Sequence, residues 1–445
     1  MKRNHQDDYP NESKRHHNES YHAPTPLTTI SISPVSRFQR NPTKSAAFRQ
    51  PKEVACFSYT AQRNLLVNNL SALKFYHPIK LDGRSNDLST GFRDRYIARE
   101  SAIENLDSML EALKIPASGG EDGSEGSLLT VADRGDGRPR FCTWRGIMTK
   151  IFVAPYSTDT WELRATLHKG TLYIMEDPVT SRPTSTFNES TKGKLMTYWG
   201  YSFENLSTLD TDPRFISPND LIQQERKRVD HGVVDTHVQF CSIVKTRVGA
   251  HDVFMGAEVD CLMTNDEPPT QKPLPSPIPP EIRQPLYAEL KTNRTLTHAN
   301  HTATFHKNKI LKTYFQCFLA GIPKVIVGFR DDRGFVESTR VYKTLEMPRM
   351  VREAAHGEAV WDPVVCINWA DEVLAVIWKT LNRANAVLDE GTRTNQVVYR
   401  IKMKGQGDGN GGGWGNRNNV QLVNEGGFIE IQEGVIDPIL SFVPE

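Results

Sequence analysis

The sequence lacks several features that would assign a class of protein at once. None of its six cysteines forms a C-x-x-C pair, and its 13 histidines form no H-x-x-H or H-x-H pair with flanking ligands. We therefore expect no zinc site, no disulfide framework and no imidazole base, and the cysteines should be reduced thiols, mostly in the core of an intracellular protein. No run of about 18 apolar residues exists and the N-terminus has no apolar leader, so we expect neither a membrane span nor a signal peptide.

The chain also lacks an excess of positive charge. It has 54 Lys and Arg against 53 Asp and Glu, which leaves a net charge of +1 over 445 residues. Any contact with RNA must therefore come from a local patch, and we expect no contact with DNA. A weak basic cluster at Lys14-Arg15-His16-His17 could serve nuclear import or could be part of a solvated tail.

Composition divides the chain into four parts. Residues 1–50 have little apolar periodicity and are expected to be a disordered tail, followed by one catalytic domain over 51–403. Eight prolines fall between residues 264 and 285, which predicts a surface loop because proline cannot join a central sheet ladder. Residues 404–419 form a Gly/Asn-rich linker, and the segment 420–445 could return as an edge strand.

Hydrophobic periodicity predicts a mixed content of helices and strands. Helical spacing covers 96–113, 215–230, 307–320 and 367–388, whereas strands fit at 239–248, 253–263, 286–292 and 324–330. Alternation over 160–177 with a turn at Lys169-Gly170 predicts a hairpin. The fold class is therefore α+β, with a mixed two-sheet core and flanking helices.

Two strand segments carry the chemistry. Glu258 and Asp260 of GAEVDCLM share one strand face, and Glu289 and Lys291 of YAELKT share another. If the strands are neighbours, three carboxylates and an ammonium meet, and a hard cation such as Mg²⁺ or Mn²⁺ would neutralise the acids. The lysine would then stabilise charge on a phosphate or orient the attacking water. Each segment alone is more typical of ordinary half-exposed sheet than of a site, but the pairing of E-x-D with E-x-K resembles the acid-acid-x-Lys arrangement of many metal-dependent nucleases.

Three further segments add polar residues at specific places. TWRG (143–146) places Arg145 just before a predicted strand, and GYSFE (200–204) ends in Glu204. KTYFQCFLAGIPKVIVGFRDDRG (312–334) is expected to be a helix ending at Gly321 and then a buried strand; the helix carries Gln316.

Together the five motifs resemble the DXO-like decapping nucleases, whose fungal members accompany the nuclear 5′→3′ exoribonuclease; the likeness covers residues 55–400. It implies a metal-dependent nuclease-like active site that hydrolyses phosphoanhydride or phosphodiester bonds at the 5′ ends of incompletely capped RNA. Triphosphate ends and unmethylated caps would be substrates, NAD-type caps are left open, and the product would be 5′-monophosphate RNA. A nuclear heterodimer with the exoribonuclease is implied. The alternative is a non-catalytic partner that stabilises the exoribonuclease.

The resemblance also implies roles for the individual residues. Glu204, Asp260 and Glu289 would ligate the metal together with the Leu290 carbonyl, and Glu258 would either ligate a second ion or hold a metal-bound water. Two Mg²⁺ or Mn²⁺ ions are thus expected, with Glu204 and Lys291 also facing substrate. Arg145 and Gln316 would contact the RNA 5′ phosphates. A structural ion pair for Arg145 stays open, as does a surface position for Gln316, which lies away from the apolar centre of its helix.

Overall fold

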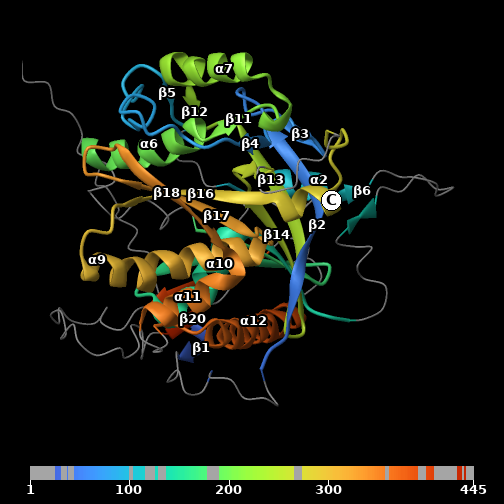
Figure 1. Ribbon diagram of the computed structural model, residues 1–445. Helices are drawn as coiled ribbons and strands as arrows, with labels where there is room; N and C mark the ends of the chain where they lie inside the picture. The colour runs from blue at the N-terminus through green and yellow to red at the C-terminus, as the bar shows by residue number, and fades with distance from the viewer. Residues whose placement is uncertain are drawn as a thin grey trace, which may run out of the picture.

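The computed structural model describes most of the region expected to be the catalytic domain and several short flanking segments. The described residues are 26–31, 38, 45–99, 104–115, 126–128, 137–177, 190–264, 273–355, 360–388, 397–404, 428–432 and 435–436. Two sheets with helices between and around them form the molecule, which confirms the expected α+β class (Figure 1).

Within the described residues, the larger sheet has eleven strands, of which ten follow the order β1-β20-β19-β9-β10-β8-β14-β13-β2-β3 and β21 pairs with β19. Along that order the strands are β1 (Pro26–Ser31), β20 (Phe428–Gln432), β19 (Val397–Lys404), β9 (Trp161–His168), β10 (Thr171–Glu176), β8 (Arg140–Trp144), β14 (His251–Glu258), β13 (Gln239–Val248), β2 (Phe48–Tyr59) and β3 (Leu65–Val67), with β21 at Val435–Ile436. The expected hairpin is confirmed as β9 and β10. Lys169 and Gly170 have φ of 42° and 74°, the left-handed pair that a two-residue hairpin turn requires.

In the part of the chain that the structure describes, the smaller sheet has six strands in the order β11-β4-β15-β16-β17-β18. They are β11 (Thr208–Leu209), β4 (Lys74–Tyr76), β15 (Cys261–Leu262), β16 (Tyr287–Arg294), β17 (Lys324–Arg330) and β18 (Val336–Lys343). Two short pairs lie outside both sheets: β5 (Tyr96–Ile97) with β12 (Val234–Asp235), and β6 (Lys114–Ile115) with β7 (Gly126–Ser127).

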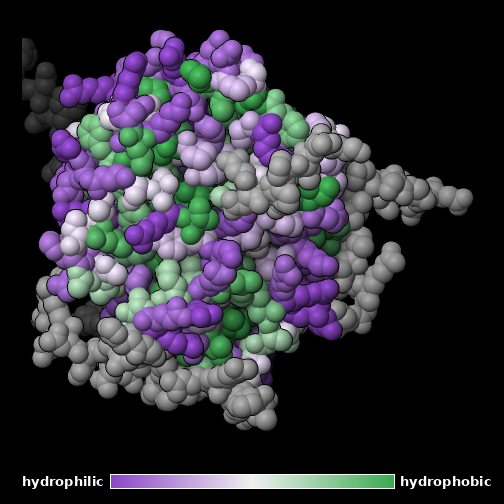
Figure 2. Space-filling view, viewed as in Figure 1, coloured by the Kyte–Doolittle hydropathy of each residue, from purple (hydrophilic) through white to green (hydrophobic). Residues whose placement is uncertain are grey.

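Helices separate and cover the sheets. The longer ones are α2 (Asp107–Leu113), α4 (Arg145–Val153), α6 (Thr191–Leu206), α7 (Pro218–His231), α10 (Leu311–Ala320), α11 (Met347–Ala354) and α12 (Pro363–Ala386); α8 (Pro280–Arg283) and α9 (Ala299–Thr304) are short, and a π-helical turn (Phe305–Ile310) leads into α10. One core joins α4, α10 and α12 to both sheets, a second packs α2 on the outer face of the large sheet, and a third packs α6 on the small sheet. In Figure 1, α6 and α10 lie on opposite sides of the small sheet, whereas α7 has no buried residue and is covered by polar side chains (Figure 2).

Several sequence expectations are corrected. The helix expected over 96–113 is only α2 at its C-terminal end, because Tyr96 and Ile97 pair with β12 instead. Arg145 does not precede a strand: it follows β8 and begins α4. The strand expected at 253–263 is two strands, β14 in the large sheet and β15 in the small one, since the chain passes from one sheet to the other between them.

The expected domain limits also need correction. Residues 26–31 of the expected N-terminal tail form strand β1, and Phe38 is 3% exposed and packs edge-on against Trp369. The C-terminal segment does supply a strand, β20, but it lies between β1 and β19 rather than at the sheet edge. Of the proline-rich stretch, residues 273–285 include α8, whereas residues 265–272 and the linker from 405 to 419 lie outside the described residues.

Candidate active site

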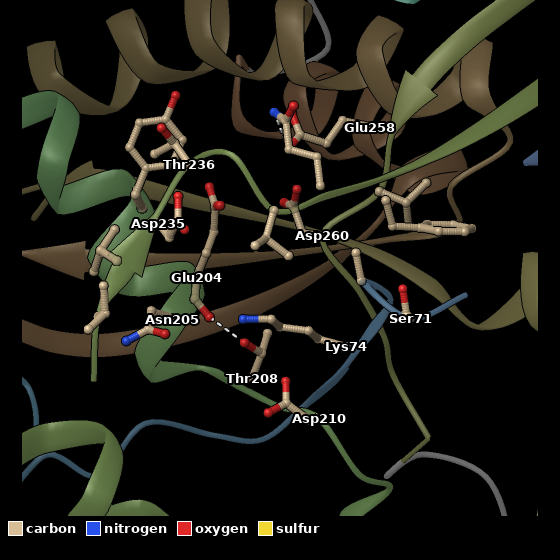
Figure 3. A pocket seen from close by; sticks show the side chains of 18 residues that line it. Ser71, Lys74, Glu204, Asn205, Thr208, Asp210, Asp235, Thr236, Glu258 and Asp260 are labelled. Carbon is tan, nitrogen blue, oxygen red and sulfur yellow. Dashed lines mark hydrogen bonds between the residues drawn. The ribbon is translucent and has the colours of Figure 1, made fainter. Parts of the chain in front are cut away.

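A pocket of about 310 Å³ opens where the two sheets meet (Figure 3). Glu204 from the last part of α6 and Glu258 and Asp260 from the crossing between β14 and β15 line it. Figure 3 shows these three carboxylates in the same cavity, with Asp260 between the other two. Residues far apart in sequence therefore bring negative charge into one space.

The passage of the chain between sheets explains how the E-x-D segment meets the E-x-K strand. β14 ends at Glu258 in the large sheet, and β15 then pairs antiparallel with β16, Cys261 opposite Ala288. Continued by one residue, that register sets Asp260 opposite Glu289. The Leu290 N–H donates a 2.6 Å hydrogen bond to Asp260 Oδ2, which fixes the acid against β16.

Glu289 lies deepest and is surrounded by cations. It is 2% exposed, and its Oε1 lies 2.6 Å from Lys291 Nζ and 3.7 Å from Arg145 Nη1. Arg145 also donates a long 3.4 Å hydrogen bond to the Glu258 carbonyl oxygen, and its side chain is 11% exposed. The ion pair that the sequence left open for Arg145 is thus present, and it lies inside the acidic site.

The carboxylates perturb one another strongly. Burial and the negative charge of Glu289 raise the pKa of Asp260 to about 7, and burial followed by repulsion from Asp260 raises the pKa of Glu204 well above its usual range. Removal from solvent within the pocket also raises the pKa of Glu258, although its side chain is open to the cavity and a hydrogen bond from Gln239 opposes the rise. Burial alone would raise the pKa of Glu289, but Lys291 and Arg145 hold it below its ordinary value. Neighbouring cations therefore compensate the negative charge of Glu289, whereas the charges of the other three acids are not fully compensated.

The donor set suits a hard divalent cation. Glu289 Oε2 is buried and accepts no hydrogen bond, which is costly for a carboxylate oxygen unless a cation or water completes it. Carboxylates and carbonyls are the oxygen ligands that Mg²⁺ and Mn²⁺ prefer, and the raised pKa values express burial and mutual repulsion of negative charge, both of which a cation would offset. Among the described residues, no three His, Cys, Asp or Glu side chains already converge closely enough to enclose an ion. Glu289 Oε1 instead contacts Lys291 Nζ, and Asp260 Oδ2 accepts from the Leu290 N–H.

The structure places the two remaining predicted residues, Gln316 and Leu290, differently. Gln316 on α10 is half-buried and does not line the pocket, although burial and then the nearby Glu289 raise the pKa of its neighbour Cys317. Leu290 contributes its N–H to Asp260, while the role of its carbonyl stays a prediction. All six cysteines are buried and unpaired, as expected.

Sequence reasoning missed several polar residues that also line the pocket. They include Gln239 and four residues that Figure 3 labels, Lys74, Asn205, Asp235 and Thr236. A signal existed only for Gln239: β13 and β14 form a hairpin with Cys241 opposite Glu258, so residue 239, two positions earlier, emerges on the same face. The other residues come from loops and short strands whose partners no local pattern reveals.

No described helix is long and apolar enough to cross a bilayer.

Glu289-x-Lys291 on one strand, with Asp260 held beside it, is the acid-acid-x-Lys arrangement of a metal-dependent nuclease site. Comparison with known proteins agrees with this class. Residues 49–411 match the model of the RAI1 like PD-(D/E)XK nuclease family. "Decapping nuclease RAI1" of Neurospora crassa is 34% identical over 390 residues, covering 85% of this chain and 81% of that protein. The "Decapping and exoribonuclease protein" of Bos taurus is 33% identical over 340 residues, 75% of each chain.

Solved structures share the fold. Candida albicans Rai1, in complex with pU5-Mn²⁺, superposes with a TM-score of 0.63 at 21% identity, covering 94% of this chain and 93% of that one. S. pombe Rai1, in complex with 3′-FADP, gives 0.61 at 23% identity, covering 92% and 99%. The chain belongs to the RAI1-like PD-(D/E)XK nuclease family, a family of decapping nucleases that hydrolyse RNA.

Proposed function

We propose that this chain removes pyrophosphate from 5′-triphosphate RNA and removes unmethylated caps, and that NAD-type caps are candidate substrates of the same site. The product is 5′-monophosphate RNA, a substrate for a 5′→3′ exoribonuclease in RNA quality control. The observation that carries the proposal is the group of Glu204, Glu258 and Asp260 in one pocket, together with Glu289, which lies opposite Asp260 on β16 and forms ion pairs with Lys291 and Arg145.

A divalent ion is part of the proposal. Glu204, Asp260 and Glu289 would hold it with the Leu290 carbonyl, and Glu258 would ligate a second ion or position a water. When bound, the ions would neutralise the acids and activate water as the nucleophile. The relatives' metal complexes and the buried, unsatisfied Glu289 Oε2 support this.

The cations of the site have different tasks. Lys291 is held against Glu289, and its proposed task is to stabilise the charge that develops at the attacked phosphorus. Arg145 presents a planar fork suited to a phosphate that is already present in the bound substrate. Its Nη1 is buried and makes no hydrogen bond, only the 3.7 Å ion pair with Glu289 Oε1. Gln316, one residue before Cys317, would join the phosphate contact after a rotamer change.

We further propose that the protein acts in the nucleus as a heterodimer with a 5′→3′ exoribonuclease, an idea that rests on family resemblance. A chain that only stabilises that enzyme is the competing possibility. It predicts that purified protein has no hydrolytic activity of its own.

The test uses purified full-length protein with Mg²⁺ or Mn²⁺ and RNAs carrying a 5′-triphosphate, an unmethylated cap, an NAD cap or a 5′-monophosphate. Released products are identified by mass spectrometry. Glu289→Gln should abolish release, whereas Glu346→Gln, a matched change in an exposed ion pair, should not. Absence of any product from the first three RNAs would leave the non-catalytic role.

A further inference from the structure

Gln239 links the candidate site to a pair of arginines outside it. It is the first residue of β13, it lines the pocket, and its Nε2 donates a 3.0 Å hydrogen bond to Glu258 Oε1. Glu258 ends β14 and its side chain is exposed to the cavity, so few neighbours restrict its rotation. Among the side chains of the described residues, Gln239 supplies the hydrogen bond that orients this carboxylate.

The orientation of the Gln239 amide is itself determined. Its Oε1 accepts from Arg63 Nη1 at 2.5 Å and from Arg99 Nη1 at 3.0 Å. A guanidinium only donates, so a reversed amide would set its NH₂ group against two donors. The NH₂ group must therefore face Glu258.

The two arginines are held in turn. Both donate to Glu104 Oε1, Arg63 at 2.6 Å, and Arg63 also donates to the His237 carbonyl oxygen. The Arg63 guanidinium stacks 3.6 Å above the Tyr59 ring, which restricts it to one plane. Two cations that share one carboxylate leave net positive charge beside the amide oxygen, and this charge polarises the N–H group that donates to Glu258.

We infer that Gln239 is a positioning residue: it transmits the fixed geometry of Arg63 and Arg99 to Glu258 and holds that carboxylate in the pocket toward the bound cation and substrate. The inference rests on the proposed function for the role of Glu258. Gln239 touches neither substrate nor reacting atoms in this assignment, so its effect must pass through Glu258.

The test compares Gln239→Leu, which removes all three side-chain hydrogen bonds at similar volume, with Gln223→Leu, a matched change on the exposed face of α7. Calorimetric titration with Mn²⁺ alone measures binding to RNA-free protein. Losing one hydrogen bond to a charged group predicts binding weaker by about tenfold in Gln239→Leu and unchanged in the control. In a Glu258→Gln background, Gln239→Leu should have no further effect, because the group that it orients has lost its charge.

Equal weakening in both backgrounds, or no weakening, overturns the inference. A second measurement needs neither metal nor RNA: crystal structures of metal-free wild type and Gln239→Leu. The variant should show the Glu258 carboxylate in a new rotamer or spread over several, with β13 and β14 unchanged. An identical, ordered Glu258 would also overturn it.

Kinetics separates this inference from the proposed function. If wild type hydrolyses triphosphate RNA, Gln239→Leu should lower kcat by about tenfold with KM within about twofold, since positioning acts on the reaction rather than on binding. A purely structural loss would instead lower the melting temperature of Gln239→Leu. If wild type does not hydrolyse RNA, the proposed function fails, while the Mn²⁺ titration and the Glu258 rotamer still decide the inference.

Discussion

Asp260→Asn tests whether the acidic cluster destabilises the metal-free protein, as expected of a site that binds a cation. The ordinary pKa of 3.8 rises to about 7 in the folded chain because burial and Glu289 disfavour the charged form. The folded state therefore holds this proton more tightly than the unfolded state. Asp260 costs no stability below about pH 4, and the metal-free protein loses stability as the pH rises from there through about 7.

The structure sets the size of the effect. One pKa unit corresponds to about 1.4 kcal/mol, so the upper limit is about 4 kcal/mol. Asp260 is only half-buried, and its charge is also opposed by that of Glu204. We therefore expect a destabilisation of about 1–2 kcal/mol after screening by solvent. Asparagine keeps an oxygen to accept the Leu290 N–H, so the substitution removes the charge and retains that hydrogen bond.

The assay is urea denaturation in EDTA at pH 5 and pH 8. Between these two pH values, wild type should lose about 1–2 kcal/mol more free energy of unfolding than Asp260→Asn, and Mn²⁺ at pH 8 should restore wild type alone. Asp332→Asn, in an exposed ion pair with Arg294, serves as the control and should follow wild type. Equal losses of free energy of unfolding in wild type and Asp260→Asn would refute the assignment of a repulsive cluster that binds a metal ion.

Four further outcomes are expected. Alanine at both Glu258 and Asp260 should abolish RNA hydrolysis while the melting temperature of the metal-free protein stays level or rises, because clustered negative charge is relieved; wild-type rates would mean that the site is elsewhere. Lys291→Ala should lower kcat about a hundredfold with little change in KM. Arg145→Ala should mainly raise KM, and this increase should be smaller at high salt. The reverse pattern in steady-state kinetics would exchange the roles of the two residues. Glu53→Ala should lower the free energy of unfolding, measured by urea denaturation, by about 3–5 kcal/mol. The substitution leaves the buried Arg283 without its carboxylate partner and removes the acceptor of the Tyr287 hydroxyl on β16, which carries Glu289. A loss below about 1 kcal/mol would contradict this expectation. Deletion through residue 47 should lower the melting temperature because it removes β1 and Phe38, and an unchanged value would show that they add nothing to the core.

Long periodic segments were predicted well from sequence. The strands at 239–248 and 324–330 have the predicted limits, and α7, α10 and α12 fall within a few residues of theirs. The failures occur where partners lie far away in sequence. Tyr96 pairs with Val234, and β1 pairs with a strand that begins at Phe428; neither pairing leaves a local trace.

The sequence alone was enough to predict which charged side chains lie near one another along a strand. Alternation along a strand sets Glu289 and Lys291 on one face whatever lies around them, and the E-x-D spacing keeps Glu258 and Asp260 close together. It also fixed the buried periodicity of the main helices and the turn at Lys169-Gly170. These are local properties, because backbone geometry relates residues a few positions apart without any reference to the rest of the chain.

The way in which the two strand segments and Glu204 come together depends on the tertiary structure. The expected single strand over 253–263 would have kept Asp260 in one sheet, but the chain leaves β14 after Glu258 and enters the smaller sheet at Cys261, which brings Asp260 to β16. Glu204 arrives from α6, and Arg63 and Arg99 reach Gln239 from segments more than 130 residues away. The charge states follow from this assembly, since burial and mutual repulsion arise only when distant carboxylates share one pocket.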